Sequence, residues 1–399
     1  MSARPVLLAL LGLGLLPSPS GAEDALVLDP SDPRFVGRQD LVLKLKATPH
    51  GYFRFINVPF AAETCRLFAD VLDQMPEVNL HGDAHIEQYT VTNLGRGLSD
   101  FDDCTRGKPV IDLVRFGTSL LIAARERGWT EQEDKLVSEL LRGYRDGLSR
   151  GDRVEMQTPD IVTRIRASFT WSHEGALRQA RALIAKAPLP VETFADGVFR
   201  FDELMRETRI LPPDYFKVKG TGTLTMGVGS ALDEKYLILF EGQTASDDDD
   251  LVVEAKQIRD LTGNPCLRTD VGASRVLDGA RLISYEPFSY AAVVPHCDKY
   301  FWMHDWTDDY QEATISTMLR SVKDLRQIAY DAGVQLGRAH PKRADGTRDK
   351  DRCKAGLQAL RGLEPRIRRA IREMAGRTDA AWRAFNRAST PAVAPKPEP

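Results

Sequence analysis

The stretches His81-Gly82-Asp83-Ala84-His85 and Asp100-Phe101-Asp102-Asp103 decide how the rest of this 399-residue chain is interpreted. Between them, residues 88–93 (Gln-Tyr-Thr-Val-Thr-Asn) read as a short β-rich hairpin. Such a hairpin returns the chain, so that Asp83 and Asp100 come to the same end of a strand pair. The spacing therefore predicts two carboxylates at one site.

Two neighbouring carboxylates with separate tasks suit phosphoryl transfer. One carboxylate accepts or orients the proton of the attacking hydroxyl, and others hold the divalent metal that neutralises the phosphate oxygens. Asp83 suits the first task and Asp100 the second. Another interpretation stays open, in which the acidic block is a solvated turn and His81 and His85 are structural, because such short motifs recur by chance.

Together with Asp112-Leu113, the two blocks resemble the catalytic segment of the aminoglycoside and choline phosphotransferases, a branch of the protein-kinase-like superfamily. That segment reads H-G-D-x-H-x-x-N, then a strand, then D-F or D-W, then D-L. With Gly107 and the continuation to Val114-Arg115, the chain is more closely similar to an uncharacterised bacterial family, domain of unknown function twenty-two fifty-two. Most of the chain after the leader can be aligned with that family.

The resemblance implies a phosphotransferase that uses Mg²⁺ or Mn²⁺ and moves a phosphoryl group from ATP or another nucleotide to a small hydroxyl or amino acceptor. It implies Asp83 and His85 as catalytic residues, and Asp100, Asp102 and Gln88 as metal ligands. Gln88 stands where the family pattern has asparagine. In the family pattern this asparagine helps to hold a second metal ion. The longer side chain of glutamine reaches a different position, so Gln88 departs from that pattern.

A glycine-rich segment and a lysine complete the expected nucleotide site, and both lie downstream of the acids. Residues 219–227 predict a tight turn whose N–H groups approach phosphate, because glycine tolerates positive φ and has no side chain. Residues 235–240 and 251–256 read as strands. Thr225 stands at the third glycine of G-x-G-x-x-G, so an ordinary hairpin turn and a solvated strand lysine stay open as alternatives. The expected nucleotide-binding residues are Gly220, Gly222, Thr223, Gly227 and Lys256.

The motif order differs from that of an ordinary kinase, in which the nucleotide lobe comes first. The helix that leads into a kinase catalytic loop has its counterpart in residues 325–340, after the nucleotide lobe. We therefore predict an α+β, two-lobed, protein-kinase-like fold that is circularly permuted, with a helical catalytic lobe and an antiparallel β nucleotide lobe. Surface connections tolerate such permutation. We expect His340 to be a packing residue at the helix end and Asp112 to brace the catalytic loop.

Length and composition fit a two-lobed protein, because 399 residues with 42% hydrophobic content can bury a sizeable core. Thr130-Glu131-Gln132-Glu133 predicts a capping box that opens a helix towards Leu148. Other helices are expected at 113–125, 174–186 and 311–340. The expected segments are 1–22 as signal peptide, 23–79 as entry region, 80–210 as helical catalytic lobe, 211–310 as β-rich nucleotide lobe, 311–389 as returning helices and 390–399 as disordered tail.

Charge gives no sign of a nucleic-acid partner. The formal net charge is −3 and the sequence pI is near 6.2, so the chain has no general attraction for nucleic acid or anionic membrane. Basic residues gather in the last helical region, where a solvated helix face is favoured over a phosphate- or partner-binding surface. The expected partners are a nucleotide and a small-molecule acceptor.

The leader indicates export. Arg4 precedes the apolar run 6–16, a Pro-Ser-Pro-Ser break follows, and Ser20-Gly21-Ala22 supplies the small residues that a signal peptidase requires. The run is too short to span a bilayer comfortably. We expect cleavage after Ala22 and a periplasmic or extracellular mature chain without a transmembrane segment. An uncleaved N-terminal anchor is the alternative.

Five cysteines are present and none forms a C-x-x-C pair, so a zinc ribbon or a thioredoxin-type site is not expected. An oxidising compartment allows up to two disulfides, which leaves one thiol. Cys104 lies beside the acidic block, and we expect it to be a small half-buried residue rather than a nucleophile.

Three classes of function are open. The first is the phosphotransferase. The second is an exported, catalytically degenerate kinase-like binding protein, favoured by Gln88, by Thr225 and by the scarcity of ATP outside the cytoplasm. The third is a metallophosphoesterase, in which the Asp and His of a GDxH motif hold a metal pair. It ranks well below the others, because the chain lacks the downstream Gly-Asn-His block of that fold.

Overall fold

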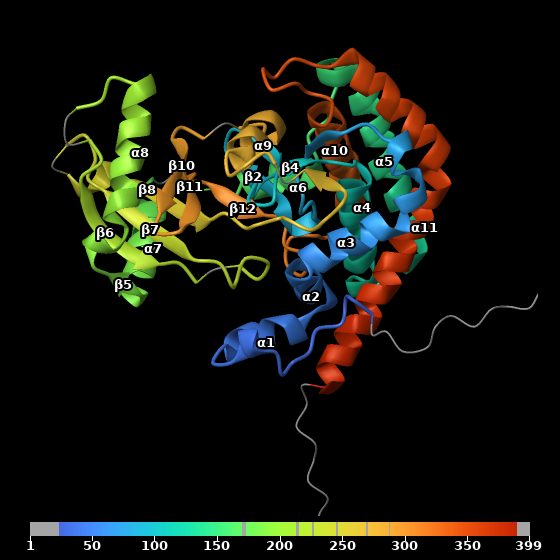
Figure 1. Cartoon of the computed structure of the whole chain (residues 1–399), viewed down its shortest axis with the longest axis horizontal. Coiled ribbons are helices and arrows are strands. Elements are labelled where there is room, and N and C mark those ends of the chain that lie inside the picture. Colours follow the sequence, from blue (N-terminus) through green and yellow to red (C-terminus); the bar gives the residue numbers. More distant parts are fainter. Residues whose placement is uncertain are drawn as a thin grey trace, which may run out of the picture.

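In the computed structural model, a lobe built on a β-sheet lies beside a lobe of packed helices (Figure 1). The structure describes residues 24–388 apart from 170–172, 213–214, 226, 245, 269 and 287. The predicted signal peptide and the predicted tail lie outside the described residues. Long helices and antiparallel sheets together confirm the predicted α+β class.

The six-stranded sheet has the strand order β10-β11-β8-β7-β6-β5, and its neighbouring strands are antiparallel. Strands β6, β7 and β8 form a meander, and β11 then pairs with β8. The strands predicted at 235–240 and 251–256 are confirmed. The bounds are β5 (Pro188–Leu189), β6 (Val218–Thr223), β7 (Lys235–Phe240), β8 (Leu251–Gln257), β10 (Ala291–His296) and β11 (Lys299–Asp305).

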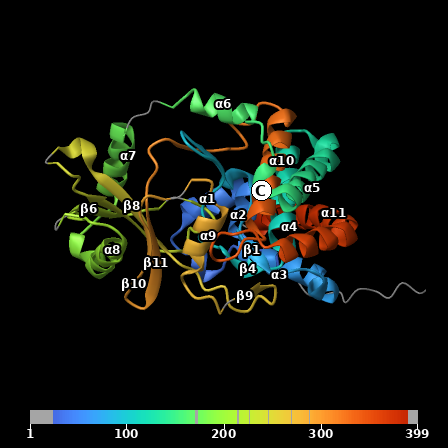
Figure 2. The same cartoon turned by 90° about the horizontal axis from the view of Figure 1, so that it is seen from above.

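Helices lie on opposite faces of this sheet (Figure 2). Side chains alternate along a strand, so each helix covers one set of them. α8 (Ala195–Thr208) packs Phe201 in a core with Ile238 and Val253, whereas α7 (His173–Lys186) packs against Leu237 and its neighbours on the other face. Both helices fall within residues 80–210, the segment predicted to form the helical lobe. They lie on the sheet instead, because their apolar faces complete its two cores.

The helical lobe is built on four long helices, α4 (Val110–Glu126), α5 (Glu133–Arg150), α10 (Val322–Ala339) and α11 (Lys350–Ala388). α5 and α10 approach closely through glycines. A Cβ at Gly143 would lie 2.2 Å from the backbone oxygen of Tyr330, and one at Gly147 would lie 2.5 Å from that of Val334. Only glycine permits this contact, which fixes α10 against its neighbour.

Shorter helices complete the lobe, and the predicted entry region is largely helical. Phe53 and Phe60 bury their rings in the core of this lobe together with residues of α4 and α11. Among the described residues, the other helices of four or more residues in this lobe are α1 (Gln39–Ala47), α2 (Pro49–Phe55), α3 (Asn57–Leu67), η2 (Ala69–Gln74) and α6 (Asp160–Arg166). In contrast, η6 (Val191–Phe194) packs in the core of the sheet lobe, and α9 (Arg275–Ile283) packs against residues of both lobes.

Two small sheets flank the acidic blocks. The first has the order β1-β4-β9, with β1 (Val78–Leu80), β4 (Thr105–Gly107) and β9 (Leu267–Arg268). The second has the order β12-β2-β3, with β12 (Tyr310–Glu312), β2 (Tyr89–Thr92) and β3 (Arg96–Leu98). The predicted hairpin is therefore present, although it extends to residue 98. Because Asp83 precedes β2 and Asp100 follows β3, the hairpin places both aspartates beyond the same end of the β2–β3 pair.

Two predicted helix starts are wrong. Residues 310–312 form β12, because they pair with β2, and α10 begins only at Val322 behind a capping box of Ser321 and Asp324. The capping box predicted at Thr130 is also absent. Residues 130–132 form a 3₁₀ turn, and α5 begins at Glu133 without a side-chain cap.

One disulfide joins Cys65 of α3 to Cys266 beside β9, and Cys104, Cys297 and Cys353 are free. Cys104 is fully buried rather than half-buried. The bond ties the chain that leaves β8 to the helical lobe. Within the described part of the chain, no helix is both long enough and apolar enough to cross a membrane.

Candidate active site

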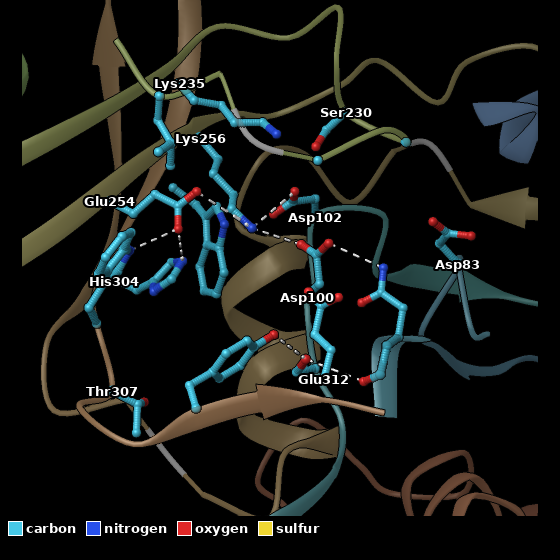
Figure 3. Close-up of a pocket in the computed structure, with 18 of the residues that line it drawn as sticks. Asp83, Asp100, Asp102, Ser230, Lys235, Glu254, Lys256, His304, Thr307 and Glu312 are labelled. Carbon is cyan, nitrogen blue, oxygen red and sulfur yellow. Dashed lines mark hydrogen bonds and ion pairs between the residues drawn. The ribbon is translucent and has the colours of Figure 1, made fainter. Parts of the chain in front are cut away.

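A cavity of about 270 Å³ lies between the two lobes, and side chains from both line it (Figure 3). The helical lobe and its small sheets contribute Arg54, Asp83, His85, Gln88, Asp100, Asp102, Asp103 and Glu312. The sheet lobe and the loops attached to it contribute Gly227, Gly229, Ser230, Lys235, Glu254, Lys256, Arg259 and His304.

Lys256 and Asp100 form an ion pair in this cavity. Nζ of Lys256 lies 2.8 Å from Oδ1 of Asp100, and Nε2 of Gln88 donates to Oδ2 of Asp100 at 3.2 Å. Lys256 stands near the end of β8, opposite Lys235 on β7 and Trp302 on β11. Asp100 has a φ of +63°, which residues other than glycine seldom adopt. The sheet and the acidic block thus meet at one contact.

Negative groups surround Lys256. Oδ2 of Asp102 lies 3.6 Å from Nζ and Oε1 of Glu254 lies 3.9 Å from it. Burial opposes the charge of Lys256, but Asp100, Asp102 and Glu254 raise its pKa well above the usual value. Burial likewise opposes the charge of Asp100, yet Lys256 holds the pKa of this carboxyl well below its usual range. Burial and the adjacent Asp100 raise the pKa of Asp102 to about 8. Lys256 and Asp100 therefore form a charged pair, and the Asp102 carboxyl beside them holds its proton more tightly than an ordinary aspartate does.

Asp83 lies elsewhere in the cavity and contacts Arg115 of α4. Nη2 and Nε of Arg115 lie 2.8 and 2.9 Å from Oδ1 of Asp83, and the guanidinium carbon lies 3.7 Å from the ring centre of Phe53. Burial raises the pKa of Asp83, although Arg115 opposes the shift. Oδ2 lies 3.8 Å from Nε2 of His85, beyond hydrogen-bond distance. Burial lowers the pKa of His85 well below its usual value, so the imidazole is neutral.

Asp112, in the first turn of α4, braces the loop that carries Asp83, as predicted. Its carboxylate accepts from the backbone N–H groups of His81 and Gly82 at 2.8 and 2.9 Å. Nε2 of His340 lies 3.0 Å from the same carboxylate, and the Tyr144 hydroxyl lies 2.9 Å from Nδ1 of His340. His340 is therefore buried at the helix end and also takes part in the brace.

The two acidic blocks also pack on each other directly. A Cβ at Gly82 would lie 2.0 Å from the backbone oxygen of Asp103, and Gly82 has a φ of +82°, so glycine is required there. Nε2 of His81 lies 2.8 Å from the backbone oxygen of Ser99. The His81 ring also packs against Phe101, with 5.6 Å between ring centres.

Three of the predicted phosphate-binding residues lie in a strand rather than in a turn. Gly220, Gly222 and Thr223 belong to β6, and none of them lines the cavity. A Cβ at Gly222 would lie 2.8 Å from Cα of Ile184, so this glycine permits the approach of α7. The turn predicted at these residues is wrong, because glycines in a strand interior also mark a close backbone neighbour.

The turn over the cavity spans residues 224–234, and Gly227, Gly229 and Ser230 line the cavity from it. Gly227 has a φ of +90°. A Cβ at Gly229 would lie 3.8 Å from Oδ2 of Asp83, which places this turn next to the predicted catalytic aspartate. Arg259 donates to the Gly229 carbonyl at 2.5 Å and to Asp233 at 2.6 Å, and so holds the turn.

Sequence reasoning missed several cavity residues. Glu254 lies two residues before Lys256 on the same strand face, and this period-2 signal could have identified it. Glu312 lies on β12, and no local pattern marks it, because distant packing brings it to the cavity. Arg54 of α2, which also lines the cavity, donates to Glu87 at 3.1 Å.

Asp100, Asp102 and Gln88 offer oxygen atoms, the ligand type that a hard divalent cation takes. Oδ1 of Asp102 is buried without a hydrogen-bond partner, whereas Asp100 accepts from Lys256 and from Nε2 of Gln88. Mg²⁺ usually keeps several waters and binds one or two carboxylates together with substrate phosphates, so such a site needs few protein oxygens. Among the described residues, no group of three or more His, Cys, Asp or Glu side chains is arranged to hold a metal ion.

These elements define an α+β protein with a polar cleft between a sheet lobe and a helical lobe. The chain belongs to a bacterial family described as an uncharacterized protein conserved in bacteria (DUF2252), whose model matches residues 42–189 and 191–388. This confirms the family to which the motifs pointed. No curated protein and no solved structure matches the chain.

Proposed function

We propose that this protein is a kinase-like phosphotransferase, which moves a phosphoryl group from ATP or another nucleotide to a small hydroxyl or amino acceptor. The observation that carries the proposal is the meeting of Asp83, Asp100 and Lys256 at one cavity, although they come from separate segments. A base, a metal-binding carboxylate and a phosphate-binding lysine are the parts that this chemistry requires.

The order of the sheet lobe supports the proposal. In protein kinases, a glycine-rich loop covers the phosphates and the conserved lysine stands on the third strand. Here the turn at 224–234 joins the first two strands of a meander, and Lys256 stands on the third. The cavity-lining residues of that turn include Gly227 and Gly229, whose backbone can approach phosphate closely.

The position of α10 supports a circular permutation. The backbone N–H of Asn79 donates to the carbonyl of His340 at 3.1 Å, and its side chain donates to Ala339 at 3.1 Å. The end of α10 therefore lies against the start of the loop that carries Asp83. An unpermuted kinase-like chain would pass directly from this helix into that loop.

Each residue has a proposed task. Asp83 accepts the acceptor's proton, because burial makes its carboxylate more basic than that of an ordinary aspartate. Arg115 holds Oδ1, which leaves Oδ2 for the proton. Lys256 and the glycine turn face the phosphates. Asp100 and Gln88, with Asp102, would hold Mg²⁺ or Mn²⁺, which when bound supplies positive charge to the phosphate oxygens.

A second candidate has its own support. The ion pairs Asp83–Arg115 and Asp100–Lys256 engage the carboxylates that the chemistry needs. A catalytically degenerate protein that binds a ligand in the cleft would keep these pairs and lose turnover. Gln88 in place of asparagine favours the same alternative.

Titration calorimetry of the mature protein with ATP, with and without Mg²⁺, tests the proposal. We expect Mg²⁺-dependent binding, and an affinity about tenfold weaker in Lys256→Met, since one lost charge contact of about 1.4 kcal/mol gives that factor. Lys217→Met is the matched control, because Lys217 is an exposed lysine of the same lobe that pairs with Glu241. ATP binding unaffected by Lys256→Met would remove the nucleotide site from this cleft.

Labelled-phosphate transfer from ATP to a set of amino and hydroxyl compounds then separates the two candidates. The phosphotransferase requires transfer that Asp83→Asn abolishes. Nucleotide binding without transfer or hydrolysis would favour the degenerate binding protein.

We also propose that the mature protein acts outside the cytoplasm. The leader sequence motivates this, and the Cys65–Cys266 disulfide supports it, because such bonds persist mainly in oxidising compartments. A phosphate donor must then be present in that compartment, or the protein must meet its nucleotide before export.

A further inference from the structure

A second cluster of reactive side chains lies away from the cleft, at the tip of the β10–β11 hairpin. His296 pairs with Lys299 across the hairpin, so Cys297 and Asp298 form its two-residue turn. Cys297 is exposed and has a φ of +55°. Its Sγ lies 3.7 Å from Nε2 of His296. The exposed thiol thus has a nitrogen base beside it.

The histidine is itself oriented by an acid. Nδ1 of His296 lies 2.5 Å from Oδ1 of Asp196, near the start of α8. The imidazole is largely buried and packs against Phe194, with 4.5 Å between ring centres, and against Phe301 at 5.7 Å. The carboxylate and the aromatic rings fix the imidazole, so that Nε2 stays directed at the sulfur.

This arrangement has the form of an activated nucleophile: a thiol, a base within reach, and a third group that orients the base. A cysteine beside histidine in a partly exposed site reacts more readily than a buried one. Cys104 and Cys353 are buried, and Cys65 and Cys266 are joined, so Cys297 is the one exposed thiol of the five cysteines, all of which the structure describes.

We propose that Cys297, activated by His296 and Asp196, is a site of thiol–disulfide exchange that takes a low-molecular-weight disulfide and becomes a mixed disulfide. His296 accepts the thiol proton, and the Cys297 sulfur attacks one sulfur of the small disulfide. A new S–S bond forms as the old one breaks, and the departing thiolate takes the proton from His296. No outside oxidant is needed, because the small disulfide is reduced as Cys297 is oxidised.

The test is the rate at which the full mature chain, with its Cys65–Cys266 bond intact, reacts with oxidised glutathione at pH 7. Intact mass and peptide mapping identify the product. We expect one adduct per chain, at Cys297, and none in Cys297→Ser. We expect His296→Gln to slow the reaction about tenfold, because the variant has no ring nitrogen beside the sulfur to accept the thiol proton.

Asp196→Asn is the second variant, because the Asp196 side chain is 62% exposed and the substitution keeps its size. It should also slow the reaction several-fold, whereas Asp202→Asn on the same helix should react like the parent protein. Asp202 pairs with Arg206 and takes no part in the cluster.

Three outcomes would overturn the proposal. The first is an equal rate in the parent protein, in His296→Gln and in Asp196→Asn. The second is reaction of Cys104 or Cys353 as fast as that of Cys297, and the third is a covalent dimer as the main product. None of them depends on nucleotide or metal, so this inference and the phosphotransferase stand or fall separately.

Discussion

Asp83 and Asp100 show how surroundings give two aspartates different chemistry. Arg115 contacts Asp83, yet burial dominates and raises its pKa. Burial also opposes the charge of Asp100, but the charge and the hydrogen bond of Lys256 together outweigh it and lower the pKa. A more basic carboxylate suits proton acceptance, whereas a carboxylate that stays charged suits metal binding.

We predict that Asp83→Asn lowers the rate of phosphoryl transfer by roughly 10²-fold or more and leaves Mg²⁺ affinity largely intact. Asp100→Asn should lose Mg²⁺ binding as well. Transfer assays and metal titration measure the two effects, and a melting temperature for each variant separates lost chemistry from lost folding. Full activity in both variants on an identified acceptor would show that the assignment is wrong.

At the scale of elements, strand β6 and helix α7 pack closely because a glycine of β6 has no side chain at their contact. Gly222 faces the backbone of α7, whereas the nearest atom to a Cβ at Gly220 is Cγ2 of Ile184, at 3.7 Å. The two glycines are close in sequence and stand in the same strand. They therefore make a matched pair.

Gly222→Ala should destabilise the protein by about 1–3 kcal/mol, because the added methyl group forces α7 away from the sheet. Gly220→Ala should be tolerated. Urea unfolding measures both. Loss of ATP affinity in both variants without loss of stability would instead indicate that these glycines bind phosphate.

Asp112 joins two more elements, since it connects the start of α4 to the end of α10 through His340. Asp112→Ala should cost about 3 kcal/mol in the free energy of unfolding, because buried donors lose a charged acceptor. The exposed Asp134 of α5 is the control, and Asp134→Ala should change stability little. Similar unfolding curves for the two variants would contradict the proposed brace.

At the scale of the whole molecule, Arg377 of α11 joins the N-terminal segment to the helical lobe. Its Nη2 lies 2.6 Å from Oδ1 of Asp24 and 2.8 Å from Oε2 of Glu63. Hydrogen bonding from Arg377 lowers the pKa of Asp24. Burial opposes the charge of Glu63, but Arg66 and Arg377 lower its pKa as well.

Lowered carboxyl pKa values give stability that is present above the unfolded-state values, near pH 4, and is lost as the pH falls. Arg377→Gln should therefore reduce the free energy of unfolding at pH 7, by about 1 kcal/mol for such part-exposed pairs, and by less at pH 3. Urea unfolding at both pH values measures this, with the exposed Arg383→Gln as control. An effect that grows as the pH falls would be of the wrong sign.

Export is a prediction about the whole molecule too. The leader predicts that the protein recovered from its native envelope begins at Glu23. N-terminal sequencing measures this. A full-length cytoplasmic species would contradict export and would remove the difficulty of finding ATP outside the cytoplasm.

The sequence by itself determined the features that depend on near neighbours. The acidic blocks, the hairpin between them and the strands at 235–240 and 251–256 follow from residue order and period-2 alternation. The helices α4 and α7 follow from helical periodicity over long runs. Local signals of this kind need no knowledge of what packs against them.

Only the tertiary structure decided which distant segments meet. It brought Arg54 and Glu312 to the cleft and paired Cys65 with Cys266. It also made residues 310–312 a strand, because pairing with the free edge of β2 stabilises them more than their helical propensity would. The physical reason is common to all of these cases: the free energy of each contact depends on faces that folding brings together, and no short stretch of sequence contains both partners.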